Sequence, residues 1–112
     1  TLGMQGGEAR MRYHLVLQFP ASSIVDFNIL IELEDSLHKI LEPEHQVDGH
    51  DFGSGQMNIF VITEHPRAAF TLAKDTLGSA DLQNFKAAYR EAGGDDYEII
   101  WPAGSSEPFE VL

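Results

Sequence analysis

The feature that most constrains the fold is a run of four apolar residues at 59–62, which follows a glycine-rich turn. A continuous apolar run of this length is typical of a central strand with both faces at least partly covered. The preceding segment 45–52 is polar and predicts an edge strand protected by charge. Gly53 and Gly55 between the two segments supply the positive φ values of a tight turn or bulge. The sequence therefore predicts an antiparallel hairpin.

The segments on either side of the hairpin have strand and helix patterns. Alternating apolar residues predict a first strand at 12–19 and a last strand at 97–101. Apolar residues at three- and four-residue steps predict a helix between the cap Ser23 and Pro43. The same spacing predicts a helix at 66–77, ended by Gly78, and a further helix at 79–92 that Ser79 opens.

This order of elements, βαββ(αα)β, divides into two βαβ-like halves. It predicts an α+β ferredoxin-like sandwich: a four-stranded antiparallel sheet with helices on one face. The strands 12–19 and 57–63 would be central, with 45–52 and 97–101 at the edges. The chain of 112 residues is enough for one domain, which we expect at 11–112. Residues 1–10 have no apolar pattern and are expected to be a flexible leader or vector-derived remnant before Met11.

Composition excludes several classes of function. Acidic residues outnumber basic ones by 18 to 7, for a net charge of -11, and such a surface repels nucleic acid and anionic membranes. The absence of cysteine excludes disulfide scaffolds, thiolate zinc sites and cysteine nucleophiles. No apolar run approaches the roughly 20 residues of a membrane helix, and the first residues have no apolar stretch typical of a signal peptide, so the pattern does not predict insertion or secretion. We therefore expect a cytoplasmic protein with neither nucleic-acid nor membrane partners.

Two segments together carry a resemblance to known proteins. They are the hairpin VDGHDFGSGQMNIF at 47–60, and Asp95, Asp96 and Tyr97 leading into Trp101 and Pro102. They resemble a family of small bacterial proteins, over most of residues 11–102. The resemblance implies a ferredoxin-like fold and a bacterial cytoplasmic origin, and it transfers no activity or catalytic residue to this chain.

The densest group of polar side chains is a candidate metal site, formed by His45, Asp48, His50 and Asp51. Imidazole and carboxylate together bind zinc, manganese or iron. On a flat strand, however, Asp48 and His50 share one face while His45 and Asp51 share the other, so a bulge at Gly49 is needed to bring three together. The favoured interpretation is a charge-protected edge strand, and no metal or cofactor is expected.

The turn at 53–55 carries the second candidate. These glycines join two strands and lack a phosphate-binding lysine, so turn chemistry explains them better than a phosphate loop. Loops on a rigid sheet commonly carry function, so the hairpin stays a candidate binding loop with His50, Ser54 and Asn58.

The sheet face away from the helices is the third candidate. If Leu15 and Leu17 face the helices, then His14 and Gln18 face outward beside apolar residues of the central strand. Such a face is larger than a monomer usually leaves wet. A homodimer, a ligand cavity between two sheets, or a monomer covered by its own tail would each account for it.

Together these features predict a non-enzymatic, small acidic binding module of regulatory or immunity type. Its partner would be a basic protein or a small ligand, bound at residues drawn from His14, Gln18, His50, Ser54 and Asn58. The alternative is a cofactor-free enzyme of the dimeric α+β-barrel kind. In that enzyme His14 would be the general base, and Gln18 and Asn58 would orient the substrate.

Overall fold

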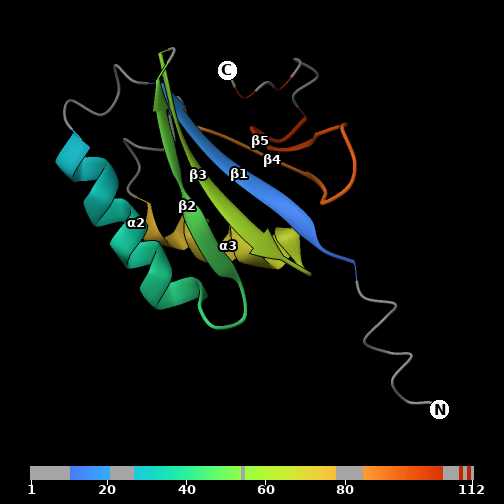
Figure 1. Cartoon of the computed structure of the whole chain (residues 1–112), viewed down its shortest axis with the longest axis horizontal. Helices are drawn as coiled ribbons and strands as arrows, with labels where there is room; N and C mark the ends of the chain where they lie inside the picture. The colour runs from blue at the N-terminus through green and yellow to red at the C-terminus, as the bar shows by residue number, and fades with distance from the viewer. Residues whose placement is uncertain are drawn as a thin grey trace.

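The computed structural model describes residues 11–20, 27–53, 55–77, 85–104, 109 and 111 (Figure 1). The elements follow in the order β1 (Tyr13–Pro20), α2 (Phe27–Leu41), β2 (Gln46–Gly53), β3 (Gln56–Thr63), α3 (Pro66–Thr76), β4 (Lys86–Glu91) and β5 (Glu98–Trp101). The strands form one five-stranded antiparallel sheet in the order β2-β3-β1-β4-β5. The fold class is α+β.

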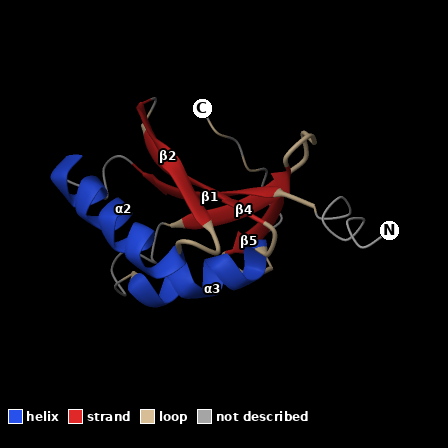
Figure 2. Ribbon diagram, turned by 60° about the horizontal axis from the view of Figure 1, so that its bottom comes forward, coloured by secondary structure: helices blue, strands red, loops and turns tan. Residues whose placement is uncertain are grey.

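Both helices pack on the same side of this sheet (Figure 2). The apolar stripe of α2 buries Leu37 and Leu41, and α3 buries Ala69, Phe70 and Ala73. Pro66 begins α3, where its fixed φ suits a helix and its missing N–H costs nothing. Neither helix, in the part of the chain described, is long and apolar enough to cross a membrane.

The core lies between these helices and the inner faces of the two central strands. β1 contributes Leu15, Leu17 and Phe19 to this core. β3 contributes the residues that pair with them, Val61, Ile59 and Met57. Ile59 therefore faces the helices, with none of its surface exposed. Its neighbour Phe60 lies on the outer face and is half-buried. The central position predicted for this hairpin arm agrees with the structure.

The predicted helix at 79–92 is wrong where the structure describes it. Residues 86–91 form β4, which pairs with β1 on one side and with β5 on the other. Phe85, Ala87 and Tyr89 alternate as in a strand, whereas Phe85, Tyr89 and Ala92 are spaced as in a helix, so the apolar pattern alone is ambiguous. Strand pairing decides between the two patterns. The backbone groups on the side of β1 away from β3 need hydrogen-bond partners, and residues 86–91 supply them as a strand.

The four-stranded βαββ(αα)β arrangement is therefore wrong: the sheet has five strands. The segment 97–101 was expected beside the first strand, but β5 pairs with β4 instead. The two predicted edges, β2 and β5, are indeed the edges of the sheet. The leader 1–10, the cap Ser23, Ser54, and the segment 78–84 with Gly78 and Ser79 lie outside the described residues.

Candidate functional site

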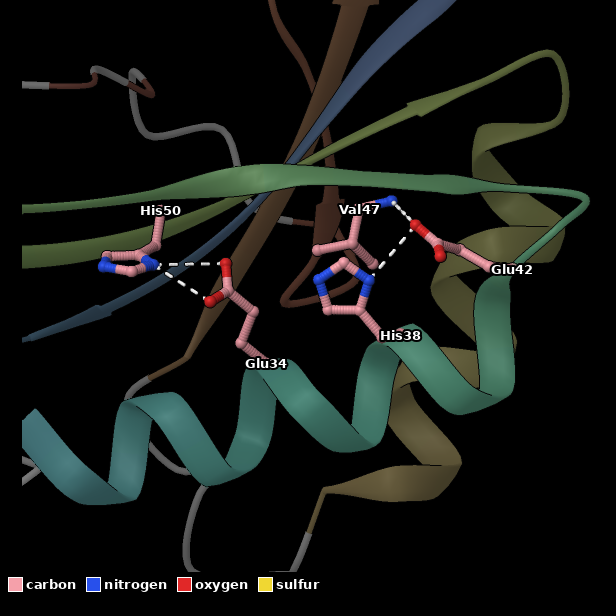
Figure 3. Close-up of polar contacts among 5 residues, drawn as sticks. All are labelled: Glu34, His38, Glu42, Val47 and His50. Carbon is pink, nitrogen blue, oxygen red and sulfur yellow. Dashed lines mark hydrogen bonds and ion pairs between the residues drawn. The ribbon is translucent and has the colours of Figure 1, made fainter.

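A bulge in β2 decides where the polar residues of the hairpin go. The register with β3 shifts between Val47 and Gly49, and Gly49 has a φ of 138°, which favours glycine. Beyond the bulge His50 lies opposite Ile59, on the face that packs against the helices. There the His50 Nδ1 atom is 3.0 and 3.2 Å from the two carboxylate oxygens of Glu34 on α2 (Figure 3).

A second carboxylate links the end of α2 to the start of β2. The Glu42 Oε2 atom is 3.2 Å from His38 Nδ1 and accepts the backbone N–H of Val47 at 3.2 Å (Figure 3). Glu34 has a side chain only 12% exposed. Glu34 on α2 and Glu42 just beyond its end thus attach the helix to the edge strand. No local pattern reveals the Glu34–His50 contact, because it depends on the bulge and on helix docking.

His45 is buried just before β2, with 4% of its surface exposed. Its Nδ1 atom is 2.7 Å from Thr63 Oγ1, which also accepts the backbone N–H of His65 at 2.8 Å. The bond from His65 leaves the hydroxyl proton of Thr63 unused, so this hydroxyl can donate to Nδ1 of a neutral His45 ring. Burial lowers the pKa of His45 below its ordinary value; Glu44 opposes this shift and His65 adds to it.

The candidate metal ligands therefore do not converge. His45 meets Thr63 and His50 meets Glu34, while Asp48 and Asp51 are exposed. The bulge at Gly49 exists, but it directs His50 to a helix carboxylate rather than toward the other candidates. Within the described ranges, no three histidine, aspartate or glutamate side chains are grouped so as to hold a metal ion.

His14 is half-buried and contacts an arginine of the neighbouring strand. Its Nδ1 atom is 3.2 Å from Arg90 Nη2, and Arg90 Nη1 donates to the carbonyl oxygens of Glu91, Ala92 and Gly94 at 2.9–3.2 Å. An arginine only donates, so Nδ1 accepts and the proton of a neutral His14 ring lies on Nε2. Neither ring nitrogen is then free to take a proton from a substrate. This geometry favours a role in holding the β4–β5 turn over general-base chemistry.

The outer sheet face does bring Gln18 and Asn58 together. Gln18 Nε2 donates to Asn58 Oδ1 at 3.1 Å, and the two residues are 7% and 1% exposed. Val16 and Ala88, on the same face, have no exposed surface. The centre of this face is therefore less open than its apolar pattern predicts, and the homodimer through it stays a prediction. A shallow hollow of about 200 Å³ borders Gln18 near Gly55 and Lys86.

A larger hollow lies at the end of the sheet where β1 begins and β4 ends. It has a volume of about 380 Å³ and is lined by Tyr13, Tyr89, Glu91, Asp95, Asp96 and Glu98, together with the Arg90–Gly94 turn. We call it the tyrosine hollow. The rings of Tyr13 and Tyr89 meet edge to face, with centroids 5.6 Å apart. The β1–β4 register brings them together, since Tyr13 pairs with Glu91 and Leu15 with Tyr89.

A charged pair spans the rim of the tyrosine hollow. The Arg67 guanidinium lies 5.8 Å from the centroid of the Tyr89 ring and forms an ion pair with Glu98 at 2.7 Å. Burial raises the pKa of the Tyr89 hydroxyl, and its hydrogen bond to Glu98 raises it further. These residues come from β4, β5 and α3, so nothing in their sequence spacing predicts the group.

Comparison with known proteins gives no relative from which a site could be transferred. The chain matches no family model, no curated protein and no solved structure. The resemblance to small bacterial proteins accordingly stays a prediction, and the functional argument depends on the geometry of the described residues.

Proposed function

We propose that this protein is a non-enzymatic acidic binding module that holds a positively charged partner protein. The observation that carries the proposal is the net charge of -11, from 18 acidic and 7 basic residues. Arg67 is paired with Glu98, and Arg90 is turned to the carbonyl oxygens of its own turn. Acidic residues such as Asp35 on α2 and Asp95 in the β4–β5 turn are exposed at the surface.

A surface of this kind acts mainly on the rate of association. Opposite charges on the partner steer it toward the acidic face and raise the association rate, and added salt screens the effect. His14, the candidate general base, supports binding rather than catalysis, because Arg90 donates to its Nδ1 and the proton of a neutral ring then lies on Nε2. A general base needs an unprotonated nitrogen within reach of its substrate.

We also propose that the first four strands, together with α2 and α3, make a ferredoxin-like unit that β5 extends. Two features support this. α2 lies between β1 and β2 in the chain, and α3 lies between β3 and β4. The spatial order β2-β3-β1-β4 then interleaves the two βαβ halves. In this arrangement the tyrosine hollow lies near the junction between the core unit and its added strand.

The binding proposal is tested by fluorescence anisotropy with two labelled peptides, hexa-arginine and hexa-glutamate. We expect hexa-arginine to bind at about 20 mM salt and to bind much more weakly at about 300 mM, where screening is strong. Hexa-glutamate should not bind at either concentration. The control is an unrelated folded protein of similar size and equal net charge. Failure of hexa-arginine to bind at low salt, or equal binding to the control, would contradict the proposed function.

A further inference from the structure

The tyrosine hollow combines a concave shape with a lining rich in acidic side chains. Its volume of about 380 Å³ is enclosed partly by the half-buried rings of Tyr13 and Tyr89 and partly by the acids of the β4–β5 turn. An aromatic ring has a negative face, and a carboxylate beside it adds a full negative charge. The lining also includes Arg90, but the four carboxylates of Glu91, Asp95, Asp96 and Glu98 outnumber this one guanidinium, so the hollow favours a cation over an anion.

The protein's own arginine demonstrates how a guanidinium binds at this edge. Arg67 lies over Tyr89 and pairs with Glu98 at 2.7 Å, although both charged side chains are about 60% exposed. Arg67 therefore occupies one side of the Tyr89 ring, where a second hollow of about 390 Å³ extends toward His65. Tyr13 and Tyr89 line both hollows, whereas Asp95 and Asp96 line the tyrosine hollow and not the one that contains Arg67.

Arg90 lies near the end of β4 and directs its donors to groups other than the carboxylates of Asp95 and Asp96. Arg90 Nη1 donates to three turn carbonyl oxygens and Nη2 donates to His14, so these donors organise the turn. The Arg90 guanidinium also lies 5.8 Å from the Tyr97 ring centroid. Asp95 and Asp96 are exposed beside this ordered turn. The turn is thus held in shape without neutralising the carboxylates at its tip.

We propose that the tyrosine hollow receives an arginine side chain of the basic partner, an inference that rests on the proposed function. The guanidinium stacks against Tyr13 and pairs with the carboxylates of Asp95 and Asp96. Arginine suits the hollow better than lysine, because a planar guanidinium combines aromatic stacking with paired N–H donors. A lysine ammonium is a compact and strongly hydrated charge. The hollow therefore selects arginine-rich over lysine-rich segments.

The first test compares two double variants that remove the same charge. D95N/D96N changes the hollow, whereas D48N/D51N changes the exposed residues of β2 outside it. We expect D95N/D96N to weaken hexa-arginine binding about tenfold at low salt, and D48N/D51N to weaken it less than about threefold. Equal losses in the two variants would overturn the hollow as the site while leaving the acidic module intact. Absence of wild-type binding would instead overturn the proposed function.

The second test measures the contribution of the Tyr13 ring to binding apart from that of the Asp95 and Asp96 carboxylates. Tyr13→Leu keeps an apolar side chain but removes the aromatic face, and it should weaken hexa-arginine about threefold to tenfold. It should weaken hexa-lysine less, so that the wild-type preference for arginine shrinks. Phe60→Leu, on the outer sheet face, is the matched control and should leave both affinities unchanged. Thermal unfolding verifies that each variant is folded. A wild-type protein without preference for hexa-arginine, or a Tyr13→Leu variant with that preference intact, would overturn the arginine site.

Discussion

Two isoleucines on the same strand provide a sharp test of which face of the sheet holds the core. Ile59 has no exposed surface and lies opposite Leu17 on β1 and His50 on β2. Ile62 lies on the other face, half-buried, opposite His14 and Gln46. The substitutions Ile59→Ala and Ile62→Ala remove the same three carbons from β3. They also change strand propensity alike, so the difference between them reports burial.

The magnitude follows from the burial of each side chain. Removing three fully buried carbons costs about 2.4 kcal/mol in transfer free energy, at about 0.8 kcal/mol for each. The cavity left between the sheet and the helices adds to this, so Ile59→Ala should cost about 3 to 4 kcal/mol. Ile62 gives up only part of its surface to folding and leaves no enclosed cavity, so Ile62→Ala should cost about 1 kcal/mol. The expected difference is about 2 kcal/mol or more.

Urea unfolding of the wild type and the two variants, followed by circular dichroism, measures these losses. A small domain has an m-value of about 2 kcal/mol per molar urea, so Ile59→Ala should lower the midpoint by about 1.5 to 2 M. The m-value itself should not change. Equal losses at the two positions, or a larger loss for Ile62→Ala, would refute the assignment of the core to the helix side. A larger loss at Ile62 would place the principal apolar contacts on the outer face.

Two further predictions concern buried and bridging histidines. The pKa of His45 is lowered from 6.5 by burial, so the unfolded chain takes up a proton first and stability should fall as the pH drops below about 6.5. In urea titrations at several pH values, His45→Gln should flatten that decline relative to wild type; an unchanged decline would argue against His45. Glu34 and His50 should be coupled by about 0.5 to 1 kcal/mol in a double-mutant cycle of E34Q and H50Q. Additive losses would mean that their contact contributes nothing to holding α2 on β2.

Sequence predicts a feature of this protein when the residues that interact are close together in the chain, and misses it when they are far apart. The positive φ of Gly55, the edge character of 45–52 and the helix ending near Pro43 are local properties, and each agrees with the structure. The Glu34–His50 contact and the pairing of Gln18 with Asn58 join distant residues. For His14, sequence indicated an outward-facing imidazole, but only strand pairing reveals that Arg90 already occupies its Nδ1.

The sequence by itself determined the hairpin, the first strand, the two described helices and the acidity of the surface. Apolar periodicity, glycine and proline act within a few residues, so these features can be interpreted without knowing what they pack against. Only the tertiary structure decided that 86–91 is a strand, because its apolar residues fit both periods and the unpaired edge of β1 selected one. The same pairing assembled the tyrosine hollow, bringing Tyr13 to Tyr89 across the sheet. Sequence spacing carries no information on such contacts, because they arise from hydrogen bonding between strands far apart in the chain.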